Sequence, residues 1–143
     1  MISSGYSVRY LRFTQIVVGL AGAGYLLAGI ALLFAPMWFF QTIGHFPPFN
    51  QHYEGDLGSF LLALGIGLLV IIRNPARHIW VIRVAALGSV LHVINHIYDA
   101  VVNTAPISEW LLEIGPLLIL ALLLLIVSFR VPDRDVKSLP SVS

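Results

Sequence analysis

The sequence predicts an all-α protein: a four-helix transmembrane bundle with its N-terminus and C-terminus in the cytoplasm. Composition points to the bilayer, because 58% of the 143 residues are hydrophobic and only 10% are charged, against about 25% charged residues in a soluble domain. The apolar residues gather in long runs, each near the ~20 residues that a helix needs to cross hydrocarbon. Helices are favoured there because they pair their backbone polar groups within the segment.

The predicted helices cover residues 13–36, 51–73, 79–102 and 108–130. We expect them to form a single membrane domain over residues 1–143, with a frayed polar tail at 131–143. The first run follows two arginines, as a signal peptide would. However, it is longer than the usual ~7–15-residue apolar region and lacks a cleavage site of small residues, so it is predicted to remain as a helix.

Local signals set the boundaries of the later helices. Asn50 follows the segment "FPPF" and is typical of an N-cap, so the second helix is expected to begin near Gln51. The third and fourth helices are joined by the short segment "NTAPI", which makes them antiparallel neighbours. Pro116 lies inside the fourth helix and predicts a kink there.

Charges are divided between the two ends of the helices. All 8 Lys and Arg residues lie near the N-terminus, near the C-terminus, or in and beside the loop between the second and third helices. Cytoplasmic segments carry the excess of Lys and Arg, so both termini are predicted to be cytoplasmic. The extracytoplasmic end instead carries acids and histidines, namely Glu54, Asp56, Asp99, Glu109, Glu113, His45, His52, His92 and His96.

Histidines and carboxylates recur at helical spacing on that end. His52 and Asp56 are four apart in the second helix, and His92 and His96 are four apart in the third, so each pair shares a helix face. Imidazole nitrogen and carboxylate oxygen suit zinc, iron or copper, and bundles build metal sites from several helices. The sequence therefore predicts a divalent transition-metal site. Its candidate ligands are His52, Asp56, His92, His96, Asp99 and Glu113.

Other roles are open to the same residues. Asp56 can instead stabilise the positive end of the second helix dipole. His92 and His96 can hydrogen-bond between helices or take part in haem, quinone or proton chemistry; a bare metal ion is preferred to haem. Glu113 lies a turn inside the fourth helix, where an ionisable residue is functional by default. Its partner would be a metal, a proton or a histidine.

Three classes of function are compatible with such a site. The leading hypothesis is a metal-binding membrane protein with an accessory or sensing role. The second is an enzyme that uses the metal to hydrolyse or oxidise a lipid or quinone, although no catalytic or cofactor-binding residue can be named. The third is an interaction subunit, because small residues four apart allow close helix packing in a homo-oligomer or a larger membrane complex.

Composition also excludes several partners and cofactors. The lipid bilayer is the expected surrounding of the chain, and its basic flank is explained by membrane topology and contact with anionic lipids rather than by nucleic-acid binding. The sequence contains no cysteine. Disulfides, thiolate metal sites, iron–sulfur clusters and cysteine nucleophiles are therefore excluded.

One short motif resembles a known kind of protein. The segment "HYEGDLG" places His52, Asp56 and Gly58 in the pattern H-x-x-x-D-x-G at the start of the second helix. With the size of the chain and its glycine-rich first helix, this resembles small bacterial four-helix integral membrane proteins that are DoxX-like. The resemblance implies a multi-pass protein of the bacterial inner membrane and supplies no activity.

Overall fold

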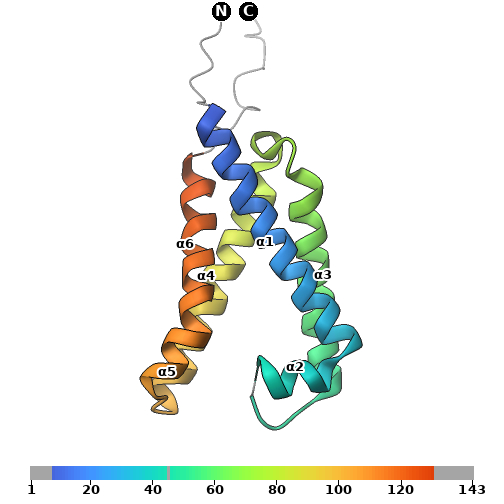
Figure 1. The fold of residues 1–143 in the computed structure, drawn as a ribbon, viewed down its shortest axis with the longest axis vertical. Coiled ribbons are helices and arrows are strands. Elements are labelled where there is room, and N and C mark those ends of the chain that lie inside the picture. Colours follow the sequence, from blue (N-terminus) through green and yellow to red (C-terminus); the bar gives the residue numbers. More distant parts are fainter. Residues whose placement is uncertain (1–7, 45, 131–143) are drawn as a thin grey trace, which may run out of the picture. The chain divides into compact units, whose positions relative to one another are not determined.

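The computed structural model describes residues 8–44 and 46–130, and that part of the chain is helical, without strands. Its elements in chain order are α1 (Val8–Phe34), α2 (Pro36–Thr42), α3 (Gln51–Ile71), the 3-10 turn η1 (Pro75–His78), α4 (Ile79–Val102), α5 (Ile107–Glu109), the π-helical turn η2 (Trp110–Ile114) and α6 (Gly115–Arg130) (Figure 1). The tail predicted to be frayed, residues 131–143, lies outside the described residues.

Four helical segments of the described chain are long and apolar enough to cross a membrane: Val8–Phe34, Gln51–Ile71, Pro75–Val102 and Trp110–Arg130. The prediction of four long apolar helices is therefore confirmed, and α4 has the predicted bounds. α1 begins earlier than predicted because an apolar run marks the part of a helix suited to hydrocarbon, whereas the helix itself continues into the polar interface.

A proline separates α1 from α2. Pro36 has no backbone N–H, and its ring disfavours the helical conformation for the residue before it. Ala35 accordingly has φ -139° and ψ 50°. As the first residue of α2, Pro36 is tolerated because the N–H at that position has no partner within a helix. The first long helix therefore ends at Phe34, and the aromatic segment after it forms a separate short helix.

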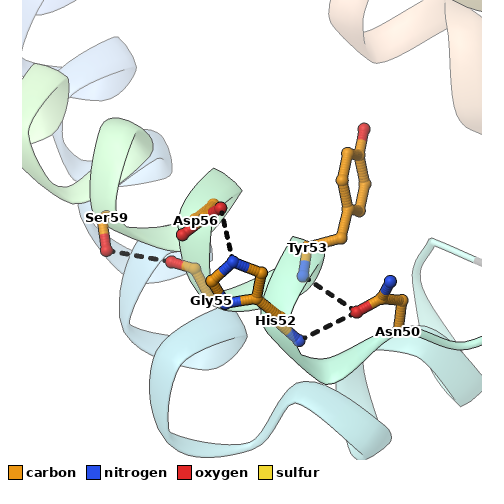
Figure 2. A network of polar contacts seen from close by, with 6 residues as sticks. All are labelled: Asn50, His52, Tyr53, Gly55, Asp56 and Ser59. Carbon is orange, nitrogen blue, oxygen red and sulfur yellow. Dashed lines mark hydrogen bonds and ion pairs between the residues drawn. The ribbon is translucent and has the colours of Figure 1, made fainter.

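α3 begins where the sequence predicts. The side-chain oxygen of Asn50 accepts hydrogen bonds from the backbone N–H groups of His52, at 3.1 Å, and Tyr53, at 3.2 Å (Figure 2). These bonds satisfy N–H groups that have no partner within the first turn of a helix. The cap fixes Gln51 as the first residue of α3 and so determines which side chains of its first turns share a face.

The chain divides into two compact units. The α1–α3 unit is Val18–Ile72, which contains most of α1 together with α2 and α3. The α4–α6 unit combines Met1–Val17, which includes the first part of α1, with Arg73–Ser143. Each unit contains a pair of long helices, and the two pairs are held together by different kinds of contact.

Glycines bring the backbones of α1 and α3 together. A Cβ atom added to Gly29 would lie 2.5 Å from the backbone nitrogen of Leu62, and one added to Gly65 would lie 2.5 Å from the backbone nitrogen of Leu26. Real Cβ atoms are essentially never found so close to other atoms. Any side chain at either glycine would therefore force the two helices apart.

Two further glycines repeat this contact along the same helices. A Cβ atom on Gly58 would lie 3.1 Å from the carbonyl oxygen of Gly29, and one on Gly22 would lie 3.2 Å from that of Gly65. The order of the pairs is reversed between the helices, as antiparallel packing requires (Figure 1). Small residues suit this role because lipid provides no hydrophobic drive for helix association, so close van der Waals contact replaces it.

Side chains rather than glycines hold α4 against α6. The two helices lie side by side and antiparallel (Figure 1), as their short connection predicts. Val93, Ile114 and Ala121 are buried at this contact, and Leu124 is completely buried further along α6. The residues that pack around the first three are Val90, Ile97, Ala100, Trp110 and Leu117. The second pair of helices therefore depends on interlocking apolar side chains.

The helix predicted over 108–130 is helical from Ile107 to Arg130, but its hydrogen bonding changes along the way. Trp110–Ile114 is π-helical and immediately precedes α6, whose second residue is Pro116. Because proline has no N–H to donate to the preceding turn, a change to π-helical bonding is accommodated there. Thr104, just after α4, has φ 51°. Glycine or asparagine is more usual in this left-handed position, which strains a β-branched residue.

Candidate functional site

The first candidate pair lies in the first two turns of α3. The Nε2 atom of His52 is 3.5 Å from the Oδ2 atom of Asp56 (Figure 2). Their separation by four residues brings the two side chains together on one face of the helix. The side chains are 88% and 64% exposed, respectively. The imidazole and the carboxylate are therefore both accessible to a third group.

An open depression of about 520 Å³ lies beside this pair. It is lined by Leu33, Gln51, His52, Gly55, Asp56 and Ser59. The Oγ atom of Ser59 donates a 2.9 Å hydrogen bond to the carbonyl oxygen of Gly55 (Figure 2). Ser59 was not a candidate from the sequence, although it is three residues beyond Asp56 and shares its face. The depression thus combines an apolar side chain of α1 with polar groups of α3.

The second candidate pair lies on α4, in the α4–α6 unit. The ring centroids of His92 and His96 are 4.6 Å apart, and the ring planes are inclined at 80°. The edge of one imidazole therefore faces the other ring. His92 is exposed, whereas His96 is half-buried. Helical spacing brings these two rings together as expected.

Asp99 lies near the end of α4 and has a partner on its own helix. Its Oδ2 atom accepts a 3.2 Å hydrogen bond from the Nδ2 atom of Asn95. Asn95 is exposed and Asp99 is half-buried. The side-chain amide therefore holds one carboxylate oxygen in place while the other oxygen keeps its acceptor capacity.

Glu113 lies in η2 and is half-buried. In π-helical bonding the backbone partners are five residues apart rather than four. Side chains in such a turn are displaced from the faces that a continuous α-helix would give them. The position of Glu113 relative to its neighbours therefore could not be predicted by extending the α-helical pattern of α6 backwards.

Two polar side chains, Ser89 and Glu54, are buried in the structure. Ser89 is on the packed side of α4. Its hydroxyl donates a 2.6 Å hydrogen bond to the carbonyl oxygen of Ala85 in the preceding turn of the same helix. Glu54, in the first turn of α3, is only 8% exposed. It was not a predicted ligand. The sequence feature that could have indicated its burial is its position four residues before Gly58, on the same helix face, which packs against α1.

Within the described residues, no group of three or more His, Asp or Glu side chains is arranged to hold a metal ion. His52 and Asp56 belong to the α1–α3 unit, whereas His92, His96, Asp99 and Glu113 belong to the α4–α6 unit. The structure thus brings together two pairs of candidates, one in each unit. The predicted convergence of all six residues on one site stays a prediction.

No family model matches the chain, and neither a curated protein nor a solved structure matches it. The resemblance to DoxX-like proteins therefore stays a prediction. The helices themselves define the class of protein at a coarser level. Four segments of the described chain have the length and apolar composition of membrane spans, which are the properties of a multi-pass helical membrane protein.

Proposed function

We propose that this small multi-pass membrane protein binds a divalent transition metal ion at its extracytoplasmic end and acts in an accessory or sensing role. The distribution of Lys and Arg supports an orientation in which both termini are cytoplasmic. The resemblance in "HYEGDLG" supports a bacterial inner membrane as the location. Zinc, iron and copper all accept the nitrogen and oxygen ligands that the chain offers there.

The adjacent imidazoles of His92 and His96 carry this proposal. Their ring centroids are 4.6 Å apart on one side of a single helix, so both rings can turn a nitrogen toward one ion. Histidine nitrogen binds zinc at about 2.0–2.1 Å. Metal binding also supplies a reason for keeping two polar rings inside a membrane-spanning segment, where such residues are retained for function.

The His52–Asp56 pair supports metal binding independently. Two ligands that each lie about 2.0–2.1 Å from a tetrahedral ion are separated by roughly 3.4 Å. The Nε2–Oδ2 distance in this pair is 3.5 Å, so little rearrangement would be needed. The carboxylate also interacts favourably with the N-terminal end of α3. Substitution of His52 separates the two roles, because it removes a ligand and leaves that interaction in place.

The experiment is zinc binding to the full-length protein, purified in detergent and stripped of metal with a chelator. Zinc is added, excess is removed, and the bound metal is measured by mass spectrometry. We expect bound zinc to fall at least tenfold when His92→Ala and His96→Ala are combined in a His52→Ala background. Restoring His52 should recover the share of zinc that the α3 pair binds.

His78→Ala is the matched control, because His78 is an exposed histidine in η1, away from both pairs. It should bind as much zinc as the unchanged protein, and circular dichroism should show equal helix content in all variants. Absence of stoichiometric zinc in the unchanged protein would refute the proposal. Equal zinc retention by the triple variant would refute it as well.

A metal-dependent enzyme acting on a lipid or quinone is the second candidate, and the depression beside His52 is the observation that favours it. Its volume of about 520 Å³ is within the range of small-molecule sites, about 300–1,000 Å³. Leu33 offers an apolar contact, while Asp56 and Ser59 are polar. Zinc-loaded protein incubated with phospholipid vesicles should then hydrolyse an ester bond and release a fatty acid or a headgroup, detectable by mass spectrometry. Equal turnover in His52→Ala would contradict this role.

A further inference from the structure

The depression beside His52 is built entirely by the α1–α3 unit, Val18–Ile72. Its lining residues are Leu33, near the end of α1, and Gln51, His52, Gly55, Asp56 and Ser59 of α3. Its walls therefore do not depend on the second unit. The volume of about 520 Å³ is many times the ~30 Å³ that a water molecule occupies in the liquid. A metal ion bound by His52 and Asp56 would thus leave room beside it for another molecule.

The lining of the depression supplies only part of a metal ion's coordination. Zinc usually takes four ligands in tetrahedral arrangement, drawn from histidine nitrogen, carboxylate oxygen and thiolate sulfur. Among the residues that line the depression, His52 and Asp56 are the ones that carry such groups. Two coordination positions are therefore left for ligands from outside the lining, and a molecule in the depression would lie next to them.

The charges of the α1–α3 unit favour a phosphate group as that ligand. A doubly charged ion held by neutral His52 and ionised Asp56 keeps one positive charge, which the single negative charge of a phosphodiester would balance. Zinc also binds phosphoryl oxygen as a Lewis acid. The unit contains no Lys or Arg. Without the metal ion, it could therefore offer a phosphate group only the positive charge of protonated His52.

The depression lies at the level of lipid headgroups. α3 is long and apolar enough to cross the membrane, and Asp56 is its last charged residue. At 1.5 Å per residue, Asp56 is about 7.5 Å beyond Gln51, and each headgroup layer is roughly 5–7 Å thick. Leu33, one residue before the end of α1, offers an apolar contact. The phosphodiester that reaches this depression most directly is therefore that of a phospholipid.

The other polar groups favour a headgroup that also carries a positive charge. The side chains of Asp56 and Ser59 lie on the same side of α3 (Figure 2). Asp56 can bind the ion through one carboxylate oxygen and accept a hydrogen bond with the other. The Ser59 hydroxyl donates to the carbonyl oxygen of Gly55 and keeps its lone pairs as acceptors. An ammonium group supplies three donors for such acceptors.

We infer that the depression binds the headgroup of a zwitterionic phospholipid. Its phosphate is bound by a metal ion on His52 and Asp56, and its ammonium group donates to Asp56 and Ser59. Leu33 contacts the apolar part of the lipid next to the headgroup. This inference rests on the proposed function and deepens it, because it names the class of lipid that meets the metal ion at α3. Lipid binding should therefore require the metal.

The first test measures zinc and lipid on the same molecule. Full-length protein with His92→Ala and His96→Ala, which removes the histidine pair of α4, is purified in detergent, loaded with zinc and given short-chain phosphatidylethanolamine. Native mass spectrometry should show one zinc ion and one lipid per chain. Removal of zinc with a chelator, or His52→Ala, should lower bound lipid at least tenfold. Equal lipid binding with and without zinc would overturn the inference.

Filling the depression provides the second test. Gly55 lines it, and a Cβ atom added there would meet nothing within 4 Å, so Gly55→Leu adds bulk without a clash. It should lower bound lipid at least tenfold and leave bound zinc unchanged. Gly24→Leu is the matched control, because a Cβ atom at Gly24 also meets nothing within 4 Å, and it should change neither. Unchanged lipid binding by Gly55→Leu would overturn the depression as the site.

Other ligands identify the chemistry of the headgroup. Phosphatidylglycerol of the same chain length has the phosphate but no ammonium group, so we expect roughly tenfold weaker binding. Inorganic phosphate lacks the ammonium group and the acyl chains, and it should not displace phosphatidylethanolamine at equal concentration. Equal binding of phosphatidylglycerol would overturn a zwitterionic headgroup as the ligand. Displacement by inorganic phosphate would overturn a lipid as the ligand.

The outcomes separate the inference from the proposed function. Zinc that is present on the unchanged protein but absent after His92→Ala and His96→Ala would overturn the inference and leave metal binding at α4 in place. Zinc bound at His52 and Asp56 without lipid would also overturn the inference alone. Absence of zinc from the unchanged protein would overturn both.

Discussion

The α1–α3 and α4–α6 helix pairs use glycine in opposite ways. In the first pair, Gly29 and Gly65 are covered by the backbone of the opposite helix. In the second, apolar side chains such as Val93 and Ile114 form the contact, and Gly88 lies outside it, since an added Cβ atom there would meet nothing within 4 Å. Small residues in a membrane helix therefore do not all have the same structural role. A glycine covered by the opposite backbone is needed for the contact of its helix pair, whereas a glycine outside that contact is not.

The largest expected effect comes from closing the glycine contact of the first pair. Gly29→Leu or Gly65→Leu places a side chain against the backbone of the opposite helix and forces the two helices apart, so we expect a loss of about 3 kcal/mol or more in the free energy of unfolding. Detergent-induced unfolding followed by circular dichroism measures it. Gly24→Leu is the control, because a Cβ atom added to Gly24 would meet nothing within 4 Å, and it should change stability far less. An equal loss of unfolding free energy in Gly24→Leu would contradict the conclusion that the covered glycines hold α1 against α3.

A smaller effect is expected from the side-chain contact of the second pair. Leu124 is completely buried, so Leu124→Ala removes its packing atoms and leaves a cavity. We expect about 2 kcal/mol of destabilisation, at the low end of the range for such changes because lipid contributes little hydrophobic drive. Leu122, which is 48% exposed, gives the control Leu122→Ala. Similar destabilisation by both substitutions would show that burial on α6 does not determine its packing.

The smallest effect concerns the start of α3. Asn50→Ala removes the acceptor for the N–H groups of His52 and Tyr53 and should lower the free energy of unfolding by about 1 kcal/mol. Asn50→Ser retains an acceptor and should recover most of that loss. If Asn50→Ala also weakens zinc binding at His52 and Asp56, the cap positions that pair. An unchanged stability would contradict the capping role.

Much of the candidate site could be predicted from spacing alone, since residues four apart on a helix are neighbours whatever surrounds the helix. His52 with Asp56, and His92 with His96, are such pairs. Burial could not be predicted in this way. Glu54 and Asp56 are both acids at the start of α3, yet Glu54 is 8% exposed and the Asp56 side chain is 64% exposed, because only one of them faces the neighbouring helix.

By itself, the sequence determined the four apolar segments, the Asn50 cap and the local side-chain pairs. These features depend on composition and on interactions within a few residues. The tertiary structure alone decided which glycines are covered, where the π-helical turn displaces Glu113, and which side of α4 packs against α6. Those features depend on the helix that packs opposite each residue, and partners distant in the chain leave no signal in local spacing.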